Sequence, residues 1–353
     1  MLTVANRIST RENNFGIVRF TAASLVVYSH SYPLSGHIVD EPLARISGIL
    51  DLATAAVIAF FVVSGFLIAK SASQSPLSRF VQARFLRIWP ALLATALLSA
   101  LVLGPIATTL PLRQYFSAKD TWLYAVAIPL LDFWRFLPET FVTNPVPLAV
   151  NGSLWTLQVE IWLYMIMTCL VLTAIKWRRA AFNCFAVIAF ISYKFFPEQI
   201  LGWIPRHDEY MTPGLVGCFI LGGLLFFNAK YVPLNFYLGC VAVLAAIVGM
   251  STSWFSILFY VAFAYWIVLL SLHPTLYISS WNSRVDYSYG IYVFAFPIQQ
   301  TIVFFFKPIG PLALFAVAYP LSVALAAILW SFVESKALAL KPSALLREAP
   351  PVT

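Results

Sequence analysis

Two ionisable side chains, Arg19 and His30, lie inside the first long apolar stretch of the chain, residues 15 to 32. A helix would place these two side chains within about 20° of one face and about 16 Å apart along its axis. A membrane interior tolerates such groups where they face protein or a water-filled cavity, and this favours a functional site. The guanidinium suits an anionic group, and the imidazole can accept a proton at neutral pH. The alternative is an arginine that extends to the membrane surface and a histidine among the lipid headgroups.

Further polar side chains occur in the next two apolar stretches. Ser64 interrupts the aromatic run FFVVSGFLIAKS, which suits either a functional hydroxyl or a small-residue packing notch. In RFLRIWP, Arg84 and Arg87 are three residues apart and therefore share a helix face. Two guanidiniums on one face can bind phosphates, and Trp89 beside them offers a surface for stacking a flat ring. Anchoring at a cytoplasmic membrane surface would explain the same arginines.

The segment NGSLWTLQVEIWLYM, which begins at Asn151, brings a carboxylate into an apolar run. Ser153 and Glu160 are about 20° from a common helix face, and Tyr164 follows Glu160 by one turn. Glu160 is expected about 9 Å from the outer end of its helix, and His30 about 3 to 5 Å from the outer end of its own. Both groups would then lie in the outer leaflet. A buried carboxylate needs a partner, and the simplest candidate is His30.

A last segment, DYSYGIYVFAFP, carries hydroxyls near the C-terminal end of the chain. Tyr289 and Tyr292 in this segment can present their hydroxyls to a cavity. A belt of tyrosines at the membrane interface would have the same sequence pattern.

Composition places the chain among membrane proteins. Of its 353 residues, 61% are hydrophobic and only 10% are charged, and the mean hydropathy is +0.85. A chain with so little polar material cannot coat a soluble globule of this size. The net charge of +8 does not indicate nucleic-acid binding, because the basic residues occupy short gaps between apolar runs. The four cysteines lie in apolar runs without metal-ligand spacing, and no metal site is expected.

Windows of about 20 apolar residues predict an all-α polytopic membrane protein with about ten transmembrane helices. The predicted spans are 15–32, 50–69, 88–108, 154–175, 181–196, 213–228, 234–250, 255–272, 287–306 and 311–333.

The distribution of basic residues predicts that both termini are cytoplasmic. With this orientation, fourteen Lys and Arg residues lie inside and seven outside, and together with Arg19 they account for all 22. This two-to-one bias agrees with the positive-inside rule. The longest gap, residues 109 to 153, would then be external and includes an amphipathic stretch at 120–137. We expect one transmembrane domain over residues 1–340, followed by a short cytoplasmic tail over 341–353.

Taken together and in order, these motifs resemble the integral-membrane acyltransferase-3 family of bacterial O-acyltransferases. Arg19 and His30 match an arginine and a histidine separated by ten residues in its first helix, and FFVVSGFLI matches its Ser-Gly-Phe motif. RFLRIWP, SLWTLQVEIWLY and SYGIY match later motifs, and FVESKALALKP resembles the closing segment, with Glu334 at its acidic position. One departure is Ala295, which occupies a place where relatives often carry a second histidine.

The resemblance implies an enzyme of the bacterial inner membrane that moves an acyl group, usually acetyl, from cytoplasmic acyl-coenzyme A to a carbohydrate. The acceptor would be a hydroxyl of an envelope or exported glycan, such as a lipopolysaccharide, an exopolysaccharide or a lipid-linked sugar. Acetyl-coenzyme A or another short acyl-coenzyme A would be a substrate, with no permanently bound cofactor.

Roles for the individual residues follow from this reading. We expect His30 to be the general base, Glu160 to orient it and Arg19 to stabilise the developing oxyanion. The residues expected to hold the donor are Ser64, Arg84, Arg87 and Trp89. Those expected to line the acceptor site or channel are Ser153, Trp155, Tyr164, Tyr289 and Tyr292. Direct acyl transfer is preferred to a covalent intermediate, because no Ser or Cys has an obvious base beside it in sequence.

The chief alternative is a proton-coupled transporter or a flippase of a lipid-linked sugar. Such a protein would use the same buried Arg, His and Glu as a proton relay. Helices broken near the middle of the membrane would favour this alternative, whereas an arginine site at the mouth of a tunnel toward His30 would favour acyl transfer.

Overall fold

The computed structural model describes residues 1–10, 12–48, 50–133, 135–173, 177–196, 211–279 and 285–340. Within these ranges the protein is all-helical, with no β-strand and only two isolated β-bridges, so the all-α part of the predicted fold class is confirmed. The tail predicted over 341–353 lies outside the described residues.

Each of the ten predicted spans overlaps a helix. These helices are α2 (Phe15–Leu34), α4 (Leu52–Gln74), α5 (Leu77–Leu98), α9 (Trp155–Thr173), α10 (Arg178–Phe195), α12 (Thr212–Phe227), α13 (Phe236–Val248), α14 (Phe255–Leu272), α15 (Ser288–Phe306) and α16 (Pro311–Leu329).

Six helical segments of the described chain are long and apolar enough to cross a membrane, fewer than the ten expected. They are Leu52–Gln74, Leu77–Ala107, Trp155–Leu172, Phe255–Leu272, Ser288–Phe306 and Pro311–Ala339. Helix α2 is not among them, because Arg19, His30 and its serine and tyrosine hydroxyls lower its hydropathy. It is nevertheless packed between α4, α15 and α16 inside the bundle.

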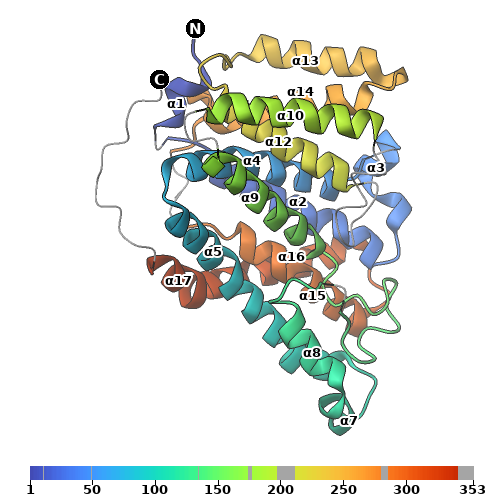
Figure 1. The fold of residues 1–353 in the computed structure, drawn as a ribbon. Helices are drawn as coiled ribbons and strands as arrows, with labels where there is room; N and C mark the ends of the chain where they lie inside the picture. Colours follow the sequence, from blue (N-terminus) through green and yellow to red (C-terminus); the bar gives the residue numbers. More distant parts are fainter. Residues whose placement is uncertain are drawn as a thin grey trace.

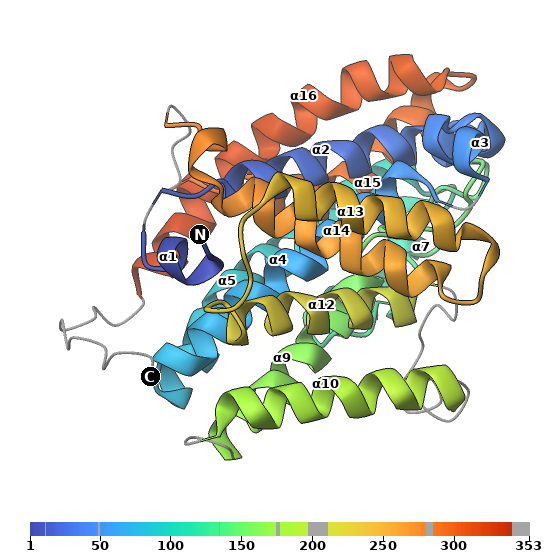
Figure 2. The same cartoon turned by 90° about the horizontal axis from the view of Figure 1, so that it is seen from above.

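Helix α4 lies in the middle of the bundle, where it packs against α2, α9, α12 and α14 (Figures 1 and 2). Its contact with α12 is a backbone contact. A Cβ atom added at Gly65 would lie 2.0 Å from the carbonyl oxygen of Phe219, and one added at Gly222 would lie 2.2 Å from that of Val62. Small residues at both positions allow this approach, as is common between membrane helices. Gly65 therefore accounts for the packing notch expected near Ser64.

Helix α5 begins eleven residues before the predicted start of its span, at Leu77 rather than at residue 88. It continues through a π-helical turn (Ser99–Leu103) into α6 (Gly104–Ala107) as one unbroken helical segment. Arg84 is therefore about 10 Å inside the helix rather than ahead of it. The predicted span starts too late because a window of apolar residues excludes the arginines. The helix nevertheless includes them, since the bundle accommodates their charges.

Short helices lie at the ends of the long ones. They are α1 (Val4–Ile8), α3 (Pro42–Ser47), α7 (Leu112–Ser117), α8 (Lys119–Ala127) and α17 (Ser335–Ala339). Of the predicted amphipathic stretch 120–137, only the part within α8 is helical. Helices α7 and α8 form the lower tip of the molecule in Figure 1.

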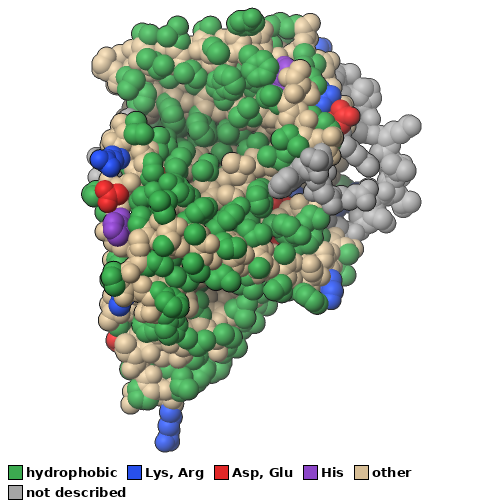
Figure 3. Space-filling view, turned by 180° about the vertical axis from the view of Figure 1, so that it is seen from behind, with side chains coloured by type: hydrophobic (Ala, Val, Ile, Leu, Met, Phe, Trp, Pro, Cys, Tyr) green, Lys and Arg blue, Asp and Glu red, His purple; other side chains and the backbone are tan. Residues whose placement is uncertain are grey.

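The bundle has two ends, here called the α1 end and the α3 end. The α1 end holds α1, α17, the end of α4 and the start of α5, at the left of Figure 1. The α3 end holds α3 and the end of α2 and lies at the right. Helix α2 runs from the first to the second, so Arg19 and His30 lie at different depths. Seen from behind, much of the surface between the ends is apolar, and charged side chains gather near its edges (Figure 3).

Candidate active site

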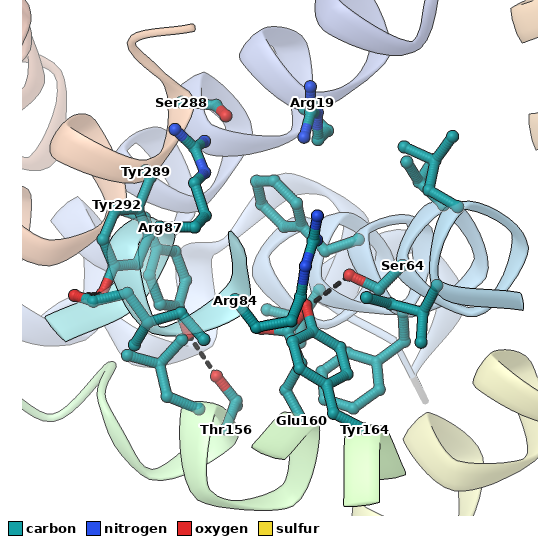
Figure 4. Close-up of a pocket in the computed structure, with 18 residues that line it drawn as sticks. Arg19, Ser64, Arg84, Arg87, Thr156, Glu160, Tyr164, Ser288, Tyr289 and Tyr292 are labelled. Carbon is teal, nitrogen blue, oxygen red and sulfur yellow. Dashed lines mark hydrogen bonds between the residues drawn. The ribbon is translucent and has the colours of Figure 1, made fainter. Parts of the chain in front are cut away.

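A cavity of about 110 Å³ lies inside the bundle, between α2, α4, α5, α9 and α15. Apolar side chains of α4 form much of its wall. Ten polar or ionisable residues also line it (Figure 4): Arg19, Ser64, Arg84, Arg87, Thr156, Glu160, Tyr164, Ser288, Tyr289 and Tyr292. Eight of these ten are among the twelve residues that the sequence indicated, and Thr156 and Ser288 are the additions.

Two carboxylates hold two of the three arginines of the cavity. Asp286 forms an ion pair with Arg19 at 3.1 Å and accepts a hydrogen bond from Arg87 at 2.6 Å, and Arg87 also donates to Glu334 at 2.9 Å. We call these four residues the ion-pair ladder. The backbone N–H and hydroxyl of Ser288 donate to the second oxygen of Asp286. Burial alone would raise the pKa of Asp286, but the guanidiniums of Arg87 and Arg19 lower it to about 2.

The ladder changes the expected roles of the arginines. Arg87 has two carboxylate partners and its guanidinium lies over the ring of Tyr289, 5.5 Å from the centroid, so it is held in place by protein groups. Arg84 forms no ion pair with any described residue, and its buried Nε has no hydrogen-bond partner there. In Figure 4 its side chain extends into the cavity between Glu160 and Arg19. Arg84 is therefore the guanidinium best placed to bind an anionic ligand.

A second polar cluster joins α4 and α9. One carboxylate oxygen of Glu160 accepts hydrogen bonds from the hydroxyl of Ser64 and, at 2.5 Å, from that of Tyr164. Helix α9 packs against α4, which brings Glu160 to Ser64 although they are far apart in sequence. The predicted pair of Glu160 with His30 is not formed among the described residues. Position along a helix indicates depth but not which neighbouring helix a side chain faces.

The two predicted tyrosines present their rings to the cavity and use their hydroxyls to tie helices together. Tyr289 donates to the carbonyl oxygen of Ile88 at 3.0 Å, which links α15 to α5. Tyr292 donates to the carbonyl oxygen of Ser153 at 2.6 Å and shares a 2.5 Å hydrogen bond with Thr156. These tyrosines therefore lie inside the bundle and not in a belt at the membrane interface.

His30 does not line the cavity. It is half-buried near the α3 end of α2, and its ring packs edge-on against Phe296, with centroids 5.6 Å apart. Phe296 is one turn of α15 beyond Tyr292, so His30 lies just past the end of the cavity. Its buried Nδ1 has no hydrogen-bond partner among the described residues. The acidic group that acts on it electrostatically is Asp51, the N-cap of α4.

Three other predicted residues also lie outside the cavity. Trp89 stacks on Phe85, with ring centroids 5.0 Å apart, and donates to the carbonyl oxygen of Pro129. Trp155 packs against the main hydrophobic core. Ser153 is buried, and its hydroxyl has no partner among the described residues.

Sequence reasoning missed the two carboxylates of the ladder. Glu334 was noted only for its place in the closing segment, yet it is an isolated acid in a long apolar run and is 1% exposed. Asp286 directly precedes the tyrosine segment and was quoted without a role. Three arginines within apolar helices require carboxylate partners, and this requirement is the signal that could have identified both.

Comparison with known proteins identifies the family. A family model described as an acyltransferase domain (acyltransferase-3) matches residues 12–331. An O-acetyl transferase of Shigella phage Sf6 is 29% identical over 308 residues, covering 83% of this chain and 86% of the relative. Nodulation protein 10 of Rhizobium leguminosarum bv. viciae is 27% identical over 370 residues, covering 96% of each chain. No solved structure matches. The chain therefore belongs to the acyltransferase-3 family and is a membrane acyltransferase.

Proposed function

We propose that this protein transfers a short acyl group, in the first instance acetyl, from acyl-coenzyme A to a carbohydrate hydroxyl, with His30 as the general base. The observation that carries the proposal is the cavity itself. It joins the guanidinium of Arg84, which forms no ion pair with any described residue, to a second polar cluster, and it ends one helical turn before His30. A donor that enters at one end and an acceptor that enters at the other can meet in such a cavity.

The donor enters from the α1 end, which is cytoplasmic in this proposal. The start of α5 and the basic residues Arg7, Lys70 and Arg79 lie near this end, in agreement with the positive-inside rule. About ten spans with both termini inside complete this topology. Arg84 binds a phosphate of coenzyme A, and the pantetheine arm, on the order of half a bilayer long, carries the thioester along the cavity.

The acceptor enters from the α3 end, where His30 removes a proton from its hydroxyl. An imidazole whose Nδ1 has no partner among the described residues is free to take this proton. A glycan at the outer face of the bacterial inner membrane is the acceptor class that fits this side. The relative from phage Sf6 is named an O-acetyl transferase, which supports acetyl as the first donor to test.

The alternative, a proton-coupled transporter or flippase, receives no specific support. Helices α2, α4, α5, α9 and α15 are continuous α-helices through the residues that line the cavity. Transporters more often place their binding sites at broken helices.

Release of free coenzyme A by the purified protein, measured with a thiol reagent in the presence of candidate oligosaccharides, tests the proposal. We expect Arg84→Ala to raise the KM for acyl-coenzyme A about tenfold or more, because a charge-assisted hydrogen bond contributes about 1.5–3 kcal/mol. Arg84→Lys should recover part of the loss, since lysine keeps the charge but not the bidentate geometry. Arg79→Ala, on the same helix but outside the cavity, is the matched control.

A folded Arg84→Ala protein with the wild-type donor KM would exclude the donor site. Absence of thiol release with every acyl-coenzyme A and glycan tested, together with proton-dependent movement of a lipid-linked sugar in vesicles, would favour the transporter.

A further inference from the structure

The structure gives Ser64 a base that the sequence did not reveal. Its hydroxyl donates a hydrogen bond to Glu160, which is 96 residues away in the chain, and both side chains face the cavity (Figure 4). A serine hydroxyl becomes a nucleophile when a base accepts its proton and a third group orients that base. Tyr164 is such a third group, because its hydroxyl donates to the same carboxylate oxygen.

From this juxtaposition we propose that Ser64 accepts the acyl group as a covalent ester before the acceptor receives it, with Glu160 as its base and acid. The inference rests on the proposed function for the donor, a thioester, and replaces direct transfer by two half-reactions.

The backbone around Ser64 is held where a nucleophile needs it. Gly65 brings α4 into backbone contact with α12, and a Cβ atom there would lie 2.0 Å from the carbonyl oxygen of Phe219. Helix α4 therefore cannot slide or rotate freely at this position, and Ser64 stays directed at the cavity. A preorganised nucleophile of this kind lowers the cost of reaching the reactive geometry.

The other hydroxyls that line the cavity have partners that make them poor nucleophiles. Ser288 donates to Asp286 at 2.5 Å, and this carboxylate already binds two arginines. Thr156 is paired with Tyr292 at 2.5 Å. Ser64 alone among these cavity-lining serine and threonine side chains donates to a carboxylate that forms no ion pair among the described residues.

In the first half-reaction the hydroxyl oxygen of Ser64 attacks the thioester carbonyl carbon while its proton passes to Glu160. The new C–O bond forms, the C–S bond breaks, and coenzyme A leaves as the thiolate. The guanidinium of Arg19 also lines this cavity and can stabilise the oxyanion of the tetrahedral intermediate, while Arg84 holds the phosphate of coenzyme A.

In the second half-reaction the acceptor hydroxyl attacks the ester on Ser64 while His30 takes its proton. Glu160 returns its proton to the oxygen of Ser64 as the ester C–O bond breaks. His30 then releases the acceptor's proton to solvent, which restores the enzyme.

Trapping the ester tests the inference. The purified wild-type protein is incubated with radiolabelled acetyl-coenzyme A in the absence of acceptor, denatured with acid and digested, and the peptides are analysed by mass spectrometry. We expect label on the peptide that contains Ser64, and none on that peptide in Ser64→Ala. Ser322→Ala, which removes another buried serine outside the cavity, should be labelled like the wild type.

Three further variants separate catalysis from folding. Ser64→Cys keeps a nucleophile and should carry label as a thioester that neutral hydroxylamine releases. Glu160→Gln cannot accept the proton and should label about 10²–10⁴-fold more slowly. His30→Gln should be labelled normally but should not pass the label to a glycan, because only its second half-reaction is impaired.

A folded Ser64→Ala protein that still acylates the glycan at the wild-type rate would overturn the covalent step and leave the proposed function intact. Label on a different residue in the wild type would also overturn it. Failure of the wild type to release coenzyme A under any condition would instead overturn the proposed function.

Discussion

Ionisable side chains are held in opposite ways at the two ends of the candidate site. In the ion-pair ladder of Arg19, Asp286, Arg87 and Glu334, every charge has a partner within 3.1 Å. At the other end, His30 packs against an aromatic ring, and its Nδ1 has no partner among the described residues. The ion pairs of the ladder fix the positions of its side chains, whereas the imidazole of His30 is left able to react.

The difference follows from the cost of burying charge. A guanidinium is always protonated, so within a bundle it needs a carboxylate, and loss of that carboxylate leaves a buried charge uncompensated. An imidazole can be buried in its neutral form and gain a charge only when it takes a proton. We therefore expect substitutions in the ladder to lower stability as well as activity, and substitution of His30 to lower activity alone.

The largest effect is expected for His30→Gln, which keeps hydrogen-bonding capacity but cannot take up a proton at neutral pH. Acyl transfer to the glycan should fall by about 10²–10⁴-fold, with little change in the KM for the donor or in the melting temperature. Kinetics of glycan acylation and thermal unfolding in the same detergent measure both. A folded variant that acylates at the wild-type rate would remove His30 from the mechanism and with it the contrast between the two ends.

A smaller loss of activity and a clear loss of stability are expected for Asp286→Asn. Arg19 and Arg87 would lose the carboxylate that they share, and breaking a buried ion pair typically costs about 3–5 kcal/mol. Displacement of Arg87 should also disturb Arg84, which lies one turn away on the same helix, and so reduce donor use by up to about tenfold. Chemical unfolding and donor kinetics measure the two effects, and Glu334→Gln is the matched comparison because it leaves the Asp286 contacts in place. Unchanged stability in Asp286→Asn would mean that the ladder contributes nothing to folding.

The smallest effect concerns pH. Because the pKa of Asp286 is lowered to about 2, against about 3.9 for an unfolded aspartate, its contribution to stability is fully present above the unfolded value. That contribution is lost only as the pH falls through the lowered pKa. The difference in melting temperature between wild type and Asp286→Asn should thus shrink as the pH falls from about 5 toward 2. A difference that disappears between pH 7 and pH 6 would show that another group controls it.

Much of the architecture could be predicted because hydropathy is a local property. The ten predicted ranges all became helices, since a run of apolar residues in a membrane has to satisfy its own backbone hydrogen bonds. The number of crossings was less predictable, as the case of α2 shows. Its polar side chains lower its hydropathy, yet its neighbours in the bundle bury it.

The candidate site could be predicted in part. The sequence singled out Arg19, Ser64, Arg84 and Glu160 because polar groups are costly in apolar helices, and all four face one cavity. The pairing between helices was predicted wrongly for Glu160, whose partners are Ser64 and Tyr164 rather than His30.

By itself, the sequence determined the class of protein, the positions of its long helices and most of the polar residues that line the candidate site. Spacing along one helix fixes the depth and face of a side chain, because the rise and turn of an α-helix are constant. Only the tertiary structure decided that Arg87 is bound by Asp286 and Glu334 and that Ser64 meets Glu160. These contacts join helices far apart in the chain, and they depend on how side chains pack between helices, which no local pattern records.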